Sequence, residues 1–181
     1  LTKTGSLILL DEMTRVNMDF VGDLCYQGAA FLSESILTSK PAGLKVFGDW
    51  KTVYQGLSSL PTKAKNSWFA FDHYYSDDAF ADALPIVFKN QPKNLFDIGG
   101  NTGKWAISCL NYDSSVQITI LDLPTQLQIA RENLQNLNLQ SRSNFYPIDL
   151  LNPESKIPLC ADVVWMSQFL DCFSKPQIIN I

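Results

Sequence analysis

The chain has 181 residues, of which 46% are hydrophobic and 18% are charged, and its formal net charge is −4. This composition predicts a folded chain with a sizeable core, because disordered chains carry too few apolar residues to bury. The acidic balance, without a basic cluster, argues against a nucleic-acid surface, and no apolar run approaches the roughly 18–20 residues of a membrane span.

The first part of the chain is predicted to be mainly helical. A short hairpin is expected at residues 1–10, and apolar residues at helical spacing predict helices over 13–38 and 49–60. Residues 40–43, with the sequence Lys-Pro-Ala-Gly, end the first of these stretches. An aromatic-rich passage at 68–75 then leads to a helix that ends near Phe88.

The second part alternates strands and helices, which is the pattern of a parallel sheet with crossover helices. Strands are predicted at 95–98, 117–122, 145–148 and 162–166. Helices are predicted at 103–111, from Pro124 onward, and at 175–181. We therefore predict an α/β fold, in which part of a doubly wound, Rossmann-like sheet at 91–181 follows a mainly helical region at 1–90.

The two ends of the chain look incomplete. The last predicted helix stops in an apolar run without a cap, and four strands leave a doubly wound sheet with an apolar edge. These features predict a piece of a longer protein, cut at both ends.

The cysteines do not indicate a metal site. They form no CxxC pair, and His73 is the only histidine. Free thiols in a reducing compartment are the expected state, so we predict a cytoplasmic protein. The four cysteines are Cys25, Cys109, Cys160 and Cys172.

The most informative segment is 97–103, Asp-Ile-Gly-Gly-Asn-Thr-Gly, between the first predicted strand and its helix. Glycines allow a sharp turn and a close ligand approach, and the helix start offers unpaired N–H groups. Asp122 and Asp149 follow the next two strands. Since the carboxyl ends of parallel strands share one edge, Asp97, Asp122 and Asp149 are expected to face one crevice.

Each acid has a ligand-binding and a structural interpretation. Asp122 is placed to accept hydrogen bonds from the ribose hydroxyls of a nucleoside, or it is a helix N-terminal acid. Asp149 contacts an adenine amino group, or it is a solvated turn acid. Asp97 lies near the turn and a ligand amino group. The dinucleotide fingerprint G-x-G-x-x-G does not fit 99–103.

Four segments resemble successive motifs of class I small-molecule O-methyltransferases, which use S-adenosylmethionine. The similar branch contains the caffeic-acid and hydroxyindole enzymes and their bacterial relatives, and the resemblance covers the chain from about residue 1 to its end. The segments are 97–103, 121–124, 148–150 and 162–170.

This resemblance implies transfer of a methyl group to a hydroxyl of a small, aromatic acceptor. It also implies a homodimer built on an N-terminal winged-helix region, whose wing hairpin would be residues 1–10, and three further strands beyond residue 181. The cofactor contacts that it implies are Asp97, Gly99, Gly100 and Gly103 in the turn, Asp122 and Leu123, Asp149 and Leu150, and Met166 and Ser167.

The chain departs from the family's phenol-methylating members just after the fourth strand. They carry a lysine and a catalytic histidine where this chain has Ser167 and Asp171. An unperturbed aspartate, with a pKa of about 3.9, is a poor base for a phenol near 10. Asp171 is therefore either a base made stronger by burial or a helix-start acid.

His73 is the second candidate base, and a ring packed among aromatic residues is the alternative. In the family the corresponding passage lies near cofactor and substrate. The resemblance therefore implies that Trp68, Phe71 and Tyr74 wall the acceptor pocket, while ordinary core is the alternative for these three residues.

Two other functions stay open. Asp171 at the histidine position favours a regulatory protein that binds S-adenosylmethionine without turnover, and a nucleotide-dependent oxidoreductase is the other rival. Methylation of DNA amino groups is disfavoured, because no Asn/Asp-Pro-Pro-Tyr signature follows the fourth strand. We expect the 181-residue piece to be inactive on its own.

Overall fold

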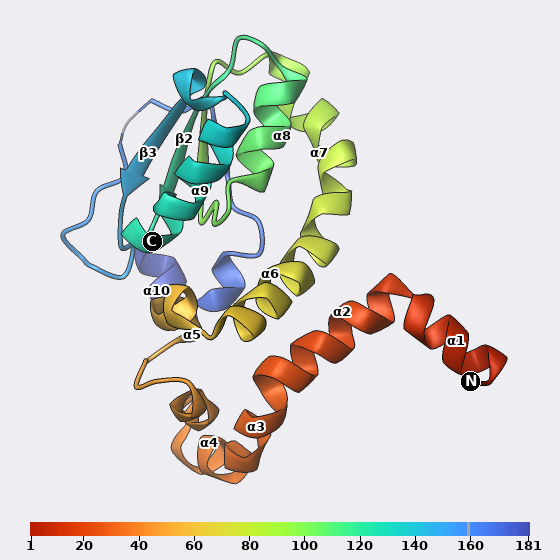
Figure 1. Cartoon of the computed structure of the whole chain (residues 1–181). Helices are drawn as coiled ribbons and strands as arrows, with labels where there is room; N and C mark the ends of the chain where they lie inside the picture. The colour runs from red at the N-terminus through yellow and green to blue at the C-terminus, as the bar shows by residue number, and fades with distance from the viewer. Residues whose placement is uncertain (159) are drawn as a thin grey trace. The chain divides into compact units, whose positions relative to one another are not determined.

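The computed structural model describes residues 1–158 and 160–181, which form two compact units, Leu1–Tyr75 and Ser76–Ile181 (Figure 1). The division falls within helix α6 (Thr62–Ser76), earlier in the chain than the expected boundary at residues 90 and 91. Residues 76–90 group with the sheet because Phe80 and Phe88 are buried in the same core as Leu95 of the first strand.

The first unit is helical. Besides α6 it contains α1 (Lys3–Leu10), α2 (Glu12–Phe20), a π-helical turn (Val21–Cys25), α3 (Tyr26–Gly28), α4 (Leu32–Thr38) and α5 (Val53–Gly56). Short 3₁₀ turns at Ala29–Phe31, Ala42–Val46 and Leu57–Ser59 connect these helices.

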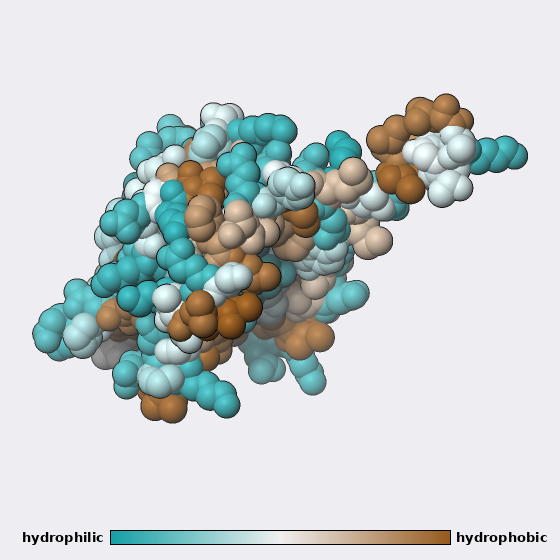
Figure 2. Space-filling view, turned by 90° about the horizontal axis from the view of Figure 1, so that it is seen from below, coloured by the Kyte–Doolittle hydropathy of each residue, from teal (hydrophilic) through white to brown (hydrophobic). Residues whose placement is uncertain are grey.

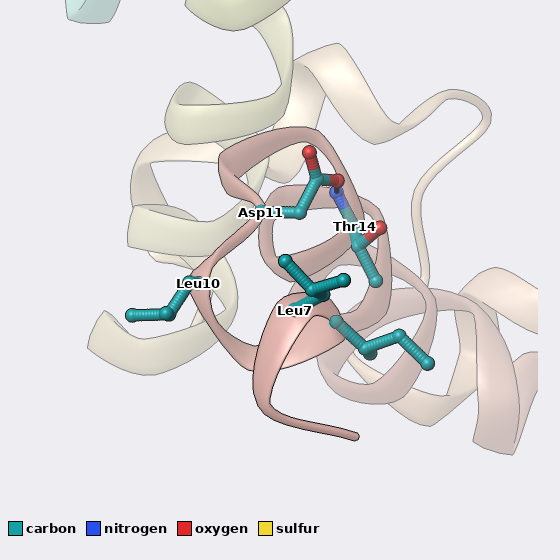
Figure 3. A pocket seen from close by; sticks show the side chains of 5 residues that line it. Leu7, Leu10, Asp11 and Thr14 are labelled. Carbon is teal, nitrogen blue, oxygen red and sulfur yellow. Dashed lines mark hydrogen bonds between the residues drawn. The ribbon is translucent and has the colours of Figure 1, made fainter. Parts of the chain in front are cut away.

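The hairpin predicted at residues 1–10 was wrong, since this segment forms helix α1. The Thr2 hydroxyl caps the helix by accepting a hydrogen bond from the Gly5 N–H at 3.1 Å. Asp11 then caps α2, because its carboxylate accepts from the Thr14 N–H at 2.8 Å. Side chains of both helices, including Leu7, line a hollow at this junction (Figure 3).

The first unit has a small core. Leu24, Leu57, Leu60 and Ala64 are its buried apolar cluster, and aromatic side chains pack around it. Large apolar side chains on α1 and α4 remain exposed, and the brown side chains on α1 at the right of Figure 2 belong to this set. They include Leu7, Leu9, Leu10, Ile36 and Leu37.

The second unit is built on a four-stranded parallel sheet in the order β3-β2-β1-β4. The strands are β1 (Asn94–Ile98), β2 (Gln117–Asp122), β3 (Ser143–Pro147) and β4 (Val163–Trp165). The helices are α7 (Phe80–Val87), α8 (Lys104–Tyr112), α9 (Pro124–Asn136) and α10 (Lys175–Asn180). The predicted α/β class, a parallel sheet after a helical region, is confirmed.

The two faces of the sheet carry separate apolar clusters, because successive strand side chains point to opposite faces. Leu95 lies in the cluster with α8 and α9, which cover one face of the sheet (Figure 1). Phe96 and Ile98 lie in the other cluster, with Leu121 and Ile148. None of the helices in the described part of the chain is long and apolar enough to cross a lipid bilayer.

Candidate functional site

The turn between β1 and α8 needs glycine at three positions. Gly99 and Gly103 have positive φ angles of 72° and 79°, a region that side chains rarely adopt. A Cβ at Gly99 would also overlap the ring of Phe169. A Cβ at Gly100 would lie 2.6 Å from Oδ2 of Asp97. The backbone of this glycine turn, residues 99–103, is therefore packed tightly from several sides.

Asp122 fastens the glycine turn to the end of β2. Its Oδ2 accepts a hydrogen bond from the Asn101 N–H at 2.8 Å, and its Oδ1 accepts from the Leu123 N–H at 2.7 Å. Burial raises the pKa of Asp122, while these two backbone hydrogen bonds oppose the rise. The carboxyl group is thus held at the carboxyl edge of the sheet, in contact with the turn.

Asp97 lies beneath the turn with 2% of its surface exposed. Its Oδ2 has no hydrogen-bond partner among the described residues. Burial, and next the charge of Asp122, raise the pKa of Asp97 to about 7, against a hydrogen bond from the Ala106 backbone. Asp97 and Asp122 therefore both lie against the glycine turn, Asp97 at Gly100 and Asp122 at Asn101.

Asp149 follows β3 at the same edge of the sheet, since the Ile148 N–H before it donates to the Asp122 carbonyl at 2.9 Å. Its side chain is exposed and accepts from the Leu151 N–H at 2.9 Å, which closes a local turn. Leu150 packs against the apolar cluster around Ile98. Asp149 is therefore the most solvated of the three acids.

The segment after β4 lies beside the glycine turn, because Trp165 of β4 is paired with Asp97 of β1. Met166 and Ser167 follow directly, with Met166 exposed and Ser167 half-buried. Asp171 is exposed in a 3₁₀ turn, Leu170–Cys172. The burial that would make this carboxyl a stronger base is not found.

The aromatic candidates lie in the first unit, on α6, and contact other residues of that unit. Phe71 stacks on Phe20 with ring centroids 4.1 Å apart, and Trp68 contacts the same ring at 5.8 Å. Tyr74 packs edge-on against Tyr75 at 5.2 Å. His73, half-buried, stacks on the Phe69 ring at 6.3 Å, which is a structural contact for this side chain.

Sequence reasoning missed two residues at the site. Phe169 covers Gly99 and contacts the Phe173 ring at 4.9 Å, a placement that depends on the path of the loop after β4. Gln126 is buried in the first turn of α9, three residues after Leu123. A polar residue at a buried helix position was the available signal for Gln126. In residues 1–158 and 160–181, no group of three or more His, Cys, Asp or Glu side chains could hold a metal ion.

Solved O-methyltransferase structures share this fold, although no protein-family model and no curated protein matches the chain. The mitomycin 7-O-methyltransferase MmcR has a TM-score of 0.72 and 20% identity, over 99% of this chain and 52% of its own. An O-methyltransferase family protein from Burkholderia thailandensis has a TM-score of 0.72 and 18% identity, over 93% and 47%.

A third structure, human N-acetylserotonin methyltransferase in complex with SAM, has a TM-score of 0.65 and 17% identity, over 92% and 45%. The chain thus spans about half the length of each of these neighbours. The structural neighbours are methyltransferases of the class that the sequence motifs resemble, and the α/β fold implied by that resemblance is confirmed, apart from the wing hairpin expected at residues 1–10.

Proposed function

We propose that the protein is an S-adenosylmethionine-dependent methyltransferase that transfers a methyl group to a hydroxyl of a small, aromatic acceptor. The observation that carries this proposal is the glycine turn hydrogen-bonded to the half-buried carboxyl of Asp122, with the buried Asp97 beneath it. Two solved relatives of the same fold are described as complexes with S-adenosylmethionine. One of them, NcsB1, also holds 2-hydroxy-5-methyl naphthoic acid.

The residues at the carboxyl edge fit this cofactor. Each Asp122 oxygen accepts one backbone N–H and keeps a further lone pair for a ribose hydroxyl. The unpartnered Oδ2 of Asp97 suits a cationic amino group. We assign the methionine part to Gly99, Gly100 and Gly103 with Asp97, the ribose and adenine to Asp122 and Leu123, the adenine to Asp149 and Leu150, and the adjoining wall to Met166 and Ser167.

The cofactor supplies a methyl group already activated by the sulfonium. The protein's own residues then have to align the acceptor and exclude water. A base is needed only where the acceptor must lose a proton. We assign Asp171 and His73 as the candidate bases, and Trp68, Phe71 and Tyr74 as candidates for the acceptor wall. Aromatic side chains of this kind suit a flat, apolar substrate.

One observation favours a second function, a regulatory protein that binds the cofactor without transferring its methyl group. Asp171 stands where phenol-methylating enzymes have histidine, and it is exposed. An exposed carboxylate is a weak base for a phenol. The oxidoreductase alternative has no such support, because the glycine spacing does not fit the dinucleotide fingerprint.

The proposal includes a homodimer formed through the first unit. Its support is the set of exposed apolar side chains on α1 and α4, such as Leu10 and Leu37, which are 82% and 86% exposed. Sedimentation velocity over a hundredfold range of concentration tests this part. A monomer throughout that range would remove the dimer from the proposal.

Methyl transfer from labelled cofactor to a panel of phenols tests the activity. We expect transfer by the protein at its full length, and binding without transfer by the 181 residues alone, which span about half of the neighbours' chains. Cofactor binding without transfer at full length would favour the regulatory function. Methyl transfer by the 181 residues alone would contradict the predicted inactivity.

A further inference from the structure

Gln126 is a buried amide that makes no hydrogen bond with its side chain. It is 4% exposed, and neither Nε2 nor Oε1 has a partner among the described residues. Leaving such a group unpaired in the interior destabilises the folded chain, and native structures rarely do so. A ligand bound beside Gln126 would supply the missing hydrogen-bond partners of its amide.

A glutamine at the third position of a helix usually accepts a hydrogen bond from the N–H of the capping residue, and in α9 Asp122 accepts that bond instead. In α10, Gln177 occupies the third helical position, and its Oε1 accepts from the N–H of the capping residue Ser174 at 2.8 Å. In α9, Gln126 is also the third residue, but the N–H of the capping residue Leu123 donates to Asp122 Oδ1 at 2.7 Å. Asp122 thus leaves the Gln126 amide without its local partner.

The face of α9 that carries Gln126 packs against the glycine turn. Ala130, one turn further along, has its Cβ 3.3 Å from the position that a Cβ of Gly103 would take. Asn133, on the same face, donates from Nδ2 to the Thr102 carbonyl at 2.9 Å. Helical spacing therefore puts Gln126 on this same face, one turn nearer than Ala130 to the end of α9 that follows Asp122.

We propose that Gln126 hydrogen-bonds the ribose hydroxyls of the bound nucleoside together with Asp122. An ionised carboxylate only accepts hydrogen bonds, whereas a hydroxyl both donates and accepts, so Asp122 alone leaves hydroxyl oxygens unpaired. The Gln126 amide offers a donor from Nε2 and an acceptor at Oε1. The pair of side chains thus matches a vicinal diol. This inference rests on the proposed function, because it requires an adenosyl ligand at the glycine turn.

The test compares Gln126→Met with the matched variant Gln128→Met on the exposed side of the same helix. Calorimetry with S-adenosylhomocysteine should give about tenfold weaker binding for Gln126→Met, the loss expected for a buried hydrogen bond, and unchanged binding for Gln128→Met. The melting temperature of ligand-free Gln126→Met should equal or exceed that of the unsubstituted chain, because an unpaired buried amide is removed.

A second measurement ties the effect to the ribose. Competition against S-adenosylhomocysteine should show that the unsubstituted chain prefers adenosine to 2′,3′-dideoxyadenosine, and that Gln126→Met narrows this preference. Full-strength binding by Gln126→Met would overturn the inference, and so would an unchanged preference. A melting temperature several degrees lower, in this variant and in Gln126→Leu, would also overturn it, because it would show that the amide is bonded within the protein. Failure of the unsubstituted chain to bind S-adenosylhomocysteine would instead overturn the proposed function, and this inference with it.

Discussion

In Ser76–Ile181 the sheet and its helices bury apolar side chains such as Leu95 and Leu134 without any exposed surface, whereas the main buried cluster of Leu1–Tyr75, around Leu57, is small. The first unit instead leaves large apolar side chains on α1 and α4 open to solvent. Burial of apolar surface is the main stabilising contribution to folding. The second unit therefore holds the larger hydrophobic core of this chain.

The two units also treat polar groups differently. The second unit buries Asp97 and half-buries Asp122 around a turn that only glycines fit. In the first unit, Asp23 is also largely buried, with a side chain that is 13% exposed, but it forms an ion pair with Lys63 at 2.7 Å. The hydrogen bond from Lys63 lowers the pKa of Asp23, whereas burial raises the pKa of Asp97 and of Asp122. The two units therefore differ in the surroundings of their carboxyl groups as well as in the size of their apolar cores.

The largest effect on stability is expected where a buried leucine of the second unit is shortened. Leu134→Ala should lower the free energy of unfolding by about 4 kcal/mol, because it leaves a cavity at a fully buried site between α9 and the sheet. Leu37→Ala, at a side chain that is 86% exposed, should change it by less than about 0.5 kcal/mol. Urea titration of both variants is the measurement. Equal losses of unfolding free energy in the two variants would contradict the described difference in burial between the two units.

The next effect concerns glycines in the two units. Gly99→Ala should lower the free energy of unfolding by about 3 kcal/mol, since alanine at a φ of +72° is strained and its Cβ overlaps Phe169. Gly22→Ala, where no atom lies within 4 Å of the added Cβ, should be neutral or slightly stabilising. Hydrogen exchange of peptides from β1 and α2 would localise each effect. Unchanged exchange in β1 of Gly99→Ala would contradict the description of the turn.

A smaller effect follows from the raised pKa of Asp97. A carboxyl whose pKa is about 7 in the folded state and near 3.8 unfolded binds its proton more tightly when folded. Stability should therefore fall by about 2 kcal/mol as the pH rises from about 5 to 7. Asp97→Asn should remove most of this fall, and the exposed Asp78→Asn should not. Parallel pH profiles for all three proteins would show that Asp97 is not the titrating group.

The sequence predicted the sheet well because its signals are local and agree with one another. Residues 117–122 contain a run of β-branched side chains, which favour strands, and Pro124 marks the start of the next helix. The three acids could be placed at one edge because parallel strands present their carboxyl ends together. In the structure, Asp97 and Asp122 both lie against the glycine turn, and Asp149 follows β3 at the same edge.

The failures have different causes. A short apolar run such as 7–10 suits a strand as well as a helix, and the caps at Thr2 and Asp11 decide the outcome. The contact of Phe169 with Gly99 joins residues far apart in the chain, so no local pattern predicts it. Gln126 resembles an ordinary capping residue in sequence, and only the hydrogen bond from Leu123 to Asp122 shows that it is not one.

The central claim, that the glycine turn and Asp122 hold an adenosyl group, is tested most directly by calorimetry on the 181-residue chain. We predict that S-adenosylhomocysteine binds more tightly than NAD. Asp122→Asn should weaken that binding by at least tenfold, because a charged acceptor is lost, while Asp149→Asn at the solvated turn should change it less than threefold. Tighter binding of NAD, or equal affinities for S-adenosylhomocysteine in the unsubstituted chain and Asp122→Asn, would contradict the account.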